Sequence, residues 1–227
     1  MRALFVALCL FATPVLAAEP PVLTLGESAE RLVQQDRLIV SLRAEATGAN
    51  AANVQAEINR RMEAAIARAR QTAGVTVETG GYWVHEERPQ NQPRRWRGVA
   101  TLELSGTDAA AVTTVAGALQ EAGLAMSGMR FELRRETARA AEDELTTEAL
   151  QRLRVRAERA ADALGLRVTG FKAVRLGAVG GEPPPRPVMM RAQMAMADAA
   201  AAPPPSAEPG RTPVRVSVEA DVVLGPK

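Results

Sequence analysis

Four methionines within eight residues are the side chains with the clearest potential to bind a ligand. Thioether sulfurs are soft ligands that suit Cu(I), and a spacing of four residues brings two of them together on a helix. Methionine is also a flexible apolar residue that can dock a loop onto its own chain or a neighbour, and it can be oxidised to the sulfoxide. Cu(I) binding and apolar docking therefore both stay open for Met189, Met190, Met194 and Met196.

Aromatic and arginine side chains gather in a second segment, residues 82–97. Arginine forks beside indole rings suit a partner protein or an anionic surface such as phosphorylated lipid headgroups. The alternative is a hairpin in which the two tryptophans pair across neighbouring strands while the arginines are solvated. The candidates for binding a partner or an anionic surface are Trp83, Arg94, Arg95, Trp96 and Arg97.

Groups for acid and base catalysis are sparse. His85 is the single histidine, and the sequence places no nucleophile beside it, so we do not expect it to act as a general base. Glu142, Asp143 and Glu144 spread by about 200° around a helix axis, so we expect a solvated first turn that interacts with the helix dipole rather than converging carboxylates. The chain carries no phosphate-binding loop and no nucleophile elbow. We therefore expect no enzyme activity and no cofactor.

Composition narrows the class of protein. One cysteine and one histidine exclude zinc fingers and cages of several Cys or His ligands. The 28 basic and 26 acidic residues nearly cancel, so no nucleic-acid partner is expected.

The first residues have the order of a secretory signal peptide. Arg2 precedes an apolar run, and small residues follow Pro14, so cleavage is expected after Ala17 or Ala18. Removing residues 1–17 also removes Cys9, the only thiol. No later apolar run is long enough to span a bilayer. We expect a periplasmic protein without a transmembrane segment in its mature chain.

Hydrophobic periodicity predicts the elements. Apolar residues alternate with polar ones near residues 38–44, 75–78, 100–104, 129–133 and 214–224, which indicates strands with one wet face. A further strand is expected near residues 168–176. Helical spacing appears over residues 50–72, 108–122 and 136–164, each followed by a glycine. In the third helix the expected inward residues are Ala141, Leu145, Ala149, Leu153, Ala157, Ala160 and Leu164. This order predicts an α+β fold with helices on one face of a largely antiparallel sheet.

Regular patterns stop between residues 180 and 211. Prolines bracket a tract of alanine and methionine there, and proline resists regular secondary structure. A long Pro/Met/Ala-rich loop is therefore expected before the last strand, since the flanking strands fit one sheet. We expect a single domain over residues 18–227 that contains this low-complexity loop.

Short motifs recur in order along nearly the whole mature chain. They are Leu23-Thr24-Leu25-Gly26-Glu27, Gln35-Asp36, Ala52-Asn53, Asn59-Arg60-Arg61-Met62, Gly98-Val99-Ala100, Ser127-Gly128-Met129-Arg130-Phe131, Glu142-Asp143-Glu144-Leu145 and Ala161-Asp162-Ala163-Leu164-Gly165. Together with the valine-rich last strand, they resemble the SIMPL-domain family of exported bacterial proteins. The resemblance implies an α+β envelope protein, associated with oxidative or envelope stress and able to oligomerise, and it brings no catalytic residues.

Two positions depart from the family pattern. Gln35-Asp36 stands where Pro-Asp is common before the first long strand, which loses a rigid turn but keeps a possible aspartate cap. Glu27 follows Gly26 where a second glycine is common, which alters the expected local backbone path. Taken together, we expect a non-enzymatic periplasmic protein that acts by self-association or by binding envelope partners. The alternative is a Cu(I)-binding module that uses the methionine loop.

Overall fold

The computed structural model describes residues 19–88, 93–177 and 208–227, and these form an α+β protein with two antiparallel sheets. The chain divides into two compact units, each built from separated segments. The first unit holds the described residues up to Ser28, residues 146–177 and residues 217–227. The second holds residues 29–145 and, among the described residues, those from 208 to 216. The predicted fold class is confirmed, although one sheet was expected and two are present.

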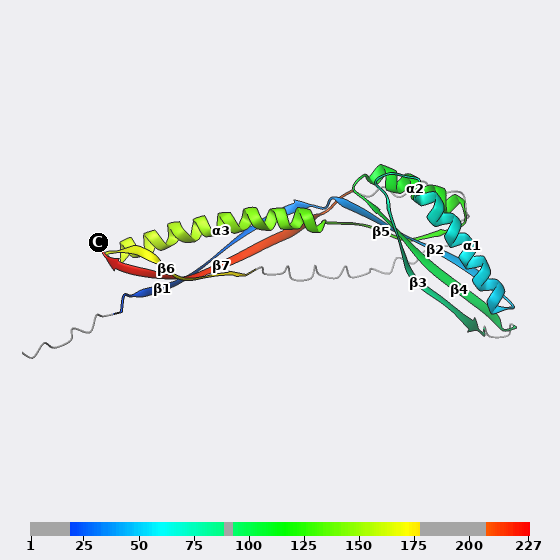
Figure 1. The fold of residues 1–227 in the computed structure, drawn as a ribbon, viewed down its shortest axis with the longest axis horizontal. Coiled ribbons are helices and arrows are strands. Elements are labelled where there is room, and N and C mark those ends of the chain that lie inside the picture. Colours follow the sequence, from blue (N-terminus) through cyan, green and yellow to red (C-terminus); the bar gives the residue numbers. More distant parts are fainter. Residues whose placement is uncertain (1–18, 89–92, 178–207) are drawn as a thin grey trace, which may run out of the picture. The chain divides into compact units, whose positions relative to one another are not determined.

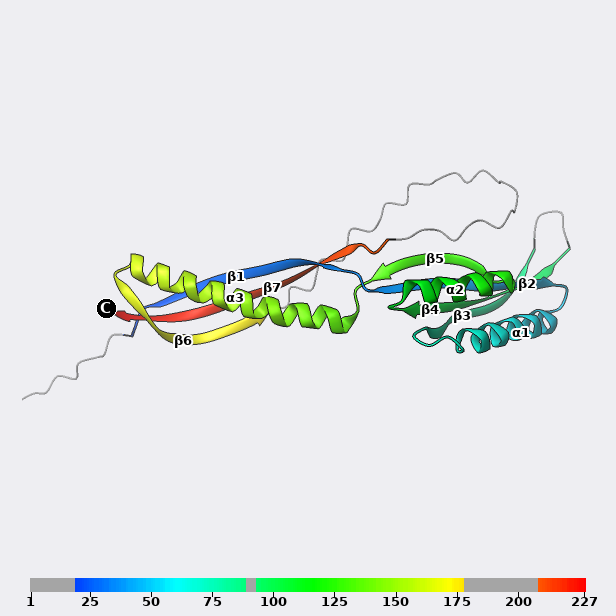
Figure 2. The ribbon, with the colours of Figure 1, turned by 90° about the horizontal axis from the view of Figure 1, so that it is seen from above.

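The second unit is built on a four-stranded antiparallel sheet. Its strands are β2 (Arg37–Gly48), β3 (Thr76–Glu87), β4 (Arg95–Gly106) and β5 (Ala125–Glu132), in the spatial order β3-β4-β2-β5. Strand β2 lies between β4 and β5, and β3 and β4 form a hairpin (Figures 1 and 2). Because alternate side chains of a strand point to opposite faces, this register decides which residues share a surface.

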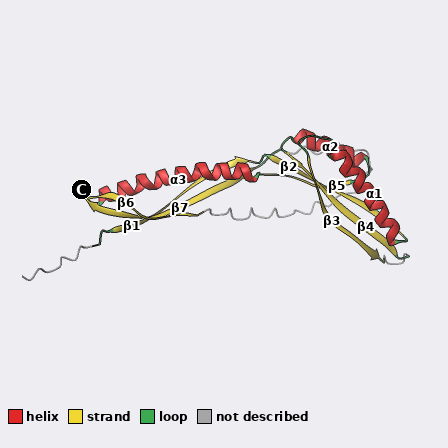
Figure 3. Cartoon of the chain, in the orientation of Figure 1, coloured by secondary structure: helices red, strands yellow, loops and turns green. Residues whose placement is uncertain are grey.

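Helices α1 (Ala51–Ala69) and α2 (Ala109–Glu121) cover one face of this sheet, as Figure 3 shows. Asn50 and Asp108 cap their first turns, because each carboxamide or carboxylate oxygen accepts a hydrogen bond from a main-chain N–H of the helix. The helices and the sheet enclose one apolar core. Its fully buried members include Leu38, Val40, Leu42, Ile58, Leu102, Leu104, Val112, Ala116 and Leu119.

The three-stranded sheet carries the longest helix. Strand β7 (Arg211–Pro226) lies between β1 (Val22–Gln34) and β6 (Leu166–Gly177), and α3 (Arg135–Ala163) runs along the sheet (Figure 2). Strands β1 and β7 and helix α3 contribute residues to both units. Within the first unit, the buried valines and leucine of β7 face one side, and Ala149, Leu153 and Ala157 of α3 are fully buried with them.

The buried stripe of α3 repeats every four residues. Ala149, Leu153, Ala157 and Ala161 are all buried, whereas Ala160 is half-buried and Leu164 is 62% exposed. Each step of four residues advances about 40° around the helix, so the stripe winds about the axis. The prediction that Ala160 and Leu164 point inward was therefore wrong, because it held the stripe on one straight line.

Helix ends were predicted better than the first strand. All three helices are followed by a glycine with positive φ, at Gly74, Gly123 and Gly165, as expected from the sequence. Strand β1 was not predicted, because Glu27 stands at a position that alternation gives to an apolar residue. None of the described helices combines the length and apolar composition that a membrane crossing requires. The expectation of a single domain stays a prediction, since two compact units can belong to one domain or to two.

Candidate functional site

The two tryptophans of the β3–β4 hairpin lie on opposite faces of the sheet. Trp83 stands opposite Val99, and Trp96 stands opposite Glu86. Trp96 has the same parity as Ala100 and therefore faces the helix side, while Trp83 is on the outer side and 47% exposed. The structural alternative of a cross-strand tryptophan pair is therefore wrong. Neither indole is fully buried, so each is still available for contacts, but not in one shared site.

A bulge at Gly80 and Gly81 sets this register. The pairing of β3 with β4 shifts between Thr79 and Tyr82. A Cβ on Gly80 would lie 2.4 Å from Oγ1 of Thr101, and a Cβ on Gly81 would lie 2.8 Å from Cζ3 of Trp83. Any larger residue at either position would therefore force the side chain of Thr101 or Trp83 to move. Together they seat the exposed indole on the outer face.

The arginines near the hairpin tip form ion pairs with carboxylates of the same chain. Arg97 donates to Glu45 at 2.8 Å and to Glu87 at 3.2 Å, and Arg95 donates to Glu87 at 3.1 Å. The hydrogen bond from Arg97, assisted by Arg95, lowers the pKa of the Glu87 carboxyl, and the hydrogen bonds of Arg97 to Glu87 and Glu45 raise the pKa of Arg97. Arg94 lies 3.6 Å from Glu86. An anionic ligand would have to compete with these carboxylates, and the binding role of the five candidates stays a prediction.

The other candidate groups do not converge on a catalytic site. His85 is half exposed, and its Nε2 lies 3.7 Å from Glu87. Helix α3 begins at Arg135, so Glu142, Asp143 and Glu144 lie about two turns inside it. The prediction that these three residues form the first turn was wrong. Glu144 accepts from Arg31 at 2.5 Å. Within the described residues, no group of three His, Cys, Asp or Glu side chains is placed to hold a metal.

The methionine tract lies outside the described residues. Met189, Met190, Met194 and Met196 all fall between residues 178 and 207. Cu(I) binding by these side chains therefore stays a prediction from the sequence.

Asp36 ties three segments of the second unit together. Its carboxylate accepts from the main-chain N–H of Arg134 at 2.9 Å, from Nε of the same residue at 2.8 Å, and from Thr137 at 2.5 Å. Arg134 is the residue before α3, and its carbonyl accepts the N–H of Ala138. Asp36 therefore caps α3 from the loop between β1 and β2. The aspartate kept in Gln35-Asp36 does have the capping role that the sequence suggested.

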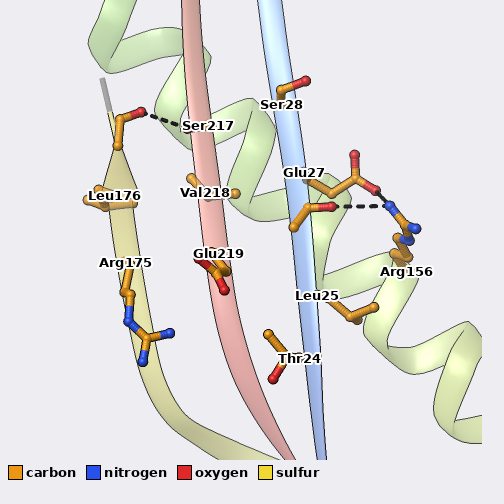
Figure 4. A pocket seen from close by; sticks show the side chains of 12 residues that line it. Thr24, Leu25, Glu27, Ser28, Arg156, Arg175, Leu176, Ser217, Val218 and Glu219 are labelled. Carbon is orange, nitrogen blue, oxygen red and sulfur yellow. Dashed lines mark hydrogen bonds and ion pairs between the residues drawn. The ribbon is translucent and has the colours of Figure 1, made fainter. Parts of the chain in front are cut away.

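Arginines of α3 cover one edge of the three-stranded sheet. The carbonyl of Pro21 accepts from Leu224 of β7, so the main-chain groups of even-numbered residues nearby point away from β7. Two of those outward carbonyls, in Gly26 and Ser28, accept from Arg156 at 3.1 Å and from Arg152 at 3.4 Å. Arg156 also pairs with Glu27 at 2.8 Å, as Figure 4 shows. The outer edge of β1 is thus hydrogen-bonded by side chains.

Next to this edge lies an open depression of about 680 Å³ lined by β1, β7, β6 and Arg156 (Figure 4). Asp221 of β7 accepts from Thr24 at 2.8 Å and from Arg175 at 3.0 Å, which links the central strand to both edge strands. The hydrogen bond from Thr24, followed by that from Arg175, lowers the pKa of Asp221. The hydrogen bonds of Thr24 and Arg175 in this part of the sheet are therefore made within the protein.

The edge formed by β6 is different. Among the described residues β6 pairs only with β7, and its exposed apolar side chains are Phe171 (45%), Val174 (47%) and Leu176 (61%). Their partners in β7 are Val222, Ala220 and Val218, all buried on the side of α3. The three side chains therefore form a row along the open edge, called here the β6 row.

Sequence reasoning missed both edges of this sheet. The arginine-bearing face of the long helix was expected to be an interaction surface, and since strand β1 was not expected, Arg152 and Arg156 could not be connected with a sheet edge. The only signal was the repeat of arginine at four-residue spacing on α3, which places successive side chains over the same neighbour. For β6, a strand was predicted near residues 168–176, but not that it lies at an edge.

Two comparisons with known proteins bear on the family of this chain. A search of curated proteins found no match. The family model for SIMPL, described as a protein of unknown function (DUF541), matches residues 23–222, from β1 into β7. Since the match covers most of the sequence, including all three helices and both sheets, this chain belongs to the SIMPL family.

Proposed function

We propose that this chain is a non-enzymatic periplasmic protein that acts through its surface, by self-association or by binding envelope partners. The observation that carries the proposal is the open edge of β6 with its row of exposed apolar side chains. An edge strand offers unpaired N–H and C=O groups to another strand. Contiguous apolar side chains beside such an edge are typical of interaction sites.

The role in tolerance of oxidative or envelope stress belongs to the same proposal. It is supported by the sequence resemblance to exported SIMPL proteins and by the secretory signal expected over residues 1–17. Fractionation of cells and N-terminal sequencing of the mature protein test the location. A strain without the chain, complemented by the wild type or by a Leu176→Glu variant, is then challenged with peroxide. Full protection by the variant would separate the stress role from the β6 row.

Sedimentation velocity over a range of concentrations tests self-association of the mature protein. Leu176→Glu places a charge in the β6 row and would weaken any association that uses this row. Leu164→Glu is the matched control, since Leu164 is 62% exposed and Leu176 is 61% exposed, but Leu164 lies at the end of α3.

A strict monomer at all concentrations would remove self-association and leave partner binding. Quantitative co-purification from the periplasm with the wild type, Leu176→Glu and Leu164→Glu then decides that part. If Leu176→Glu changes neither association nor the set of co-purified proteins, the proposal that the chain acts through this surface is wrong.

A further inference from the structure

The two outer edges of the three-stranded sheet are treated differently by the fold. On β1, guanidinium groups of α3 hydrogen-bond the outward carbonyls of Gly26 and Ser28. On β6, the side-chain hydrogen bonds of Arg167, Thr169 and Arg175 all go to β7. An incoming strand would have to displace arginines at β1, whereas none of the side-chain hydrogen bonds found among the described residues reaches the outer side of β6. Strand addition is therefore favoured at β6.

The two faces of β6 carry different chemistry. The register with β7 places Val174 and Leu176 on the side of α3, and places Arg175 on the opposite side with Glu219. Arg167 is opposite Gly225, next to the inward pair of Val168 and Leu224, so it shares the side of Arg175. A strand paired with β6 would therefore meet apolar side chains on one face and basic side chains on the other.

Charge argues against a second copy as the occupant. Strand β6 contains Arg167, Lys172 and Arg175 and no acidic residue. Pairing of two β6 strands would bring basic side chains together, and like charges opposite each other destabilise a sheet. Lysine on an edge strand is a common device against pairing with an identical strand. Pairing of β6 with β1 of another copy would meet the arginines that cover β1.

The same charges favour an acidic occupant. Arg175 pairs with Asp221 at 3.0 Å, whereas Lys172 makes no direct ion pair among the described residues, although its charge helps to lower the pKa of Asp221. A carboxylate beside Lys172 would gain an opposite charge without breaking a contact of the protein. The depletion of acidic residues extends over the whole strand, so several positions of an incoming strand would meet the same sign of charge.

We propose that β6 binds an extended segment of a partner protein by strand addition, and that this segment alternates apolar with acidic residues. Its apolar side chains lie beside the β6 row, and its carboxylates lie on the face of Arg167 and Arg175 and near Lys172. This assignment rests on the proposed function, because it takes the chain to act through its surface, and it names the class of partner.

The test uses the mature protein and a fluorescein-labelled peptide of about ten residues, the length of an ordinary strand, with alternating valine and glutamate. A second peptide has lysine in place of glutamate. A third keeps glutamate but is N-methylated at alternate residues, which blocks main-chain pairing. Fluorescence anisotropy is expected to give an affinity for the glutamate peptide about tenfold or more above that for either of the others, since one lost charge pair or main-chain contact of ~1.4 kcal/mol gives this ratio.

Variants locate the binding. Lys172→Glu and Leu176→Glu should each weaken binding of the glutamate peptide by about fivefold or more, as expected for loss of one favourable contact and gain of a repulsive one. Leu164→Glu is the control and should bind like the wild type, and circular dichroism checks that all variants are folded. Equal binding of the glutamate and lysine peptides, or of the N-methylated peptide, would overturn the proposal.

Other occupants of the edge give distinct results. Loss of self-association in Leu176→Glu without selective peptide binding means that a second copy occupies β6, which overturns the acidic partner but leaves the surface-acting function standing. Tighter peptide binding after Glu182→Gln and Asp198→Asn means that acidic residues of the same chain compete for β6, which also overturns the assignment to a separate partner. A strict monomer that binds the glutamate peptide selectively supports the proposal.

Discussion

Asp36 shows how one side chain fixes the start of a long helix. Burial by itself would raise the pKa of this carboxyl, but the hydrogen bonds from Thr137 and Arg134 and the charge of Arg134 together lower it. The carboxylate form is therefore the one that the fold prefers. The same contacts join the loop before β2 to the first turn of α3.

Replacing Asp36 by alanine should destabilise the protein. The variant removes a helix cap and leaves Thr137 and Arg134 without their acceptor, and loss of such a cap costs about 1–2 kcal/mol. Urea denaturation at neutral pH measures the free energy of unfolding. The control is Glu63→Ala, since Glu63 is an exposed carboxylate on α1, and its effect should stay within about 0.5 kcal/mol.

The effect of Asp36 should also depend on pH. Because its folded pKa lies below the ordinary value of 3.8, its contribution is fully present well above that value and is lost as the pH falls through the folded pKa. The stability difference between the wild type and Asp36→Ala should therefore shrink below about pH 4. A difference that stays constant from neutral to acid pH would contradict the assignment of Asp36 as an ionised cap.

Single residues differed in how far the sequence revealed them. A possible cap at Asp36 was suggested by the family pattern, but the helix that it caps lies far away in the sequence and could not be named from it. The placement of Trp83 and Trp96 was not readable from the sequence, since it depends on the Gly80–Gly81 bulge and on the pairing across the hairpin. A shift of one residue moves a side chain to the other face of a sheet.

Two glycines of the second unit provide a matched test of packing between elements. A Cβ on Gly106, at the end of β4, would lie 2.6 Å from the carbonyl oxygen of Gly74 and 2.9 Å from Cγ2 of Val112. A Cβ on Gly117, inside α2, would meet nothing within 4 Å. The same change to alanine should therefore act in opposite directions at the two positions.

Gly106→Ala should destabilise the protein by about 1–3 kcal/mol, because the nearest neighbour is main chain and cannot turn away. Gly117→Ala should stabilise it by about 0.5–1 kcal/mol, because alanine loses less conformational entropy in a helix than glycine does. Thermal and urea denaturation of both variants check the signs. If both variants were destabilised by a similar amount, the difference in free space around the two glycines would not determine the effect of the change.

Most elements could be predicted because their apolar patterns are local. Each helix is followed within a few residues by a glycine that takes positive φ, and the last strand alternates cleanly. Strand β1 could not be recognised, because Glu27 points toward α3 and is made acceptable there by Arg156, a residue far away in the sequence. The winding stripe of α3 likewise follows from the surface that it covers, which a helix pattern alone does not contain.

For the whole molecule, the sequence predicted the fold class but not the number of sheets. The six predicted strands were consistent with one sheet, and no local pattern says which strands are neighbours. The separation depends on β7 pairing with β1 and β6, and on β2 pairing with β4 and β5. These pairings join distant residues, and the edges of the two sheets exist only once they have formed.

The Cu(I) alternative leads to a clear expectation for the full chain. If the methionine tract holds Cu(I), then replacing Met189, Met190, Met194 and Met196 by leucine should abolish high-affinity binding, because leucine keeps the apolar volume but removes the sulfur ligands. Competition with a chromogenic Cu(I) chelator under anaerobic conditions measures it. Met126→Leu is the control outside the tract. Unchanged affinity in the fourfold variant would remove this alternative.

Solubility of the whole molecule should depend on the arginines that cover β1. Replacing both Arg152 and Arg156 by alanine removes the donors to the outward carbonyls of Ser28 and Gly26 and opens a second sheet edge. Since exposed edges pair with other chains, the double variant should form larger species at concentrations where the wild type does not. Light scattering and sedimentation velocity measure this change.

The matched control is Arg154→Ala with Arg159→Ala. It removes the same number of arginines from α3, and the described hydrogen bond of Arg154 goes to Glu158 and not to β1. Both double variants lower the net charge equally, so a general loss of charge repulsion would affect them alike. Association confined to the Arg152 and Arg156 variant identifies main-chain edge protection as the cause. Equal association of both variants would mean that charge, and not the covered edge, keeps the molecules apart.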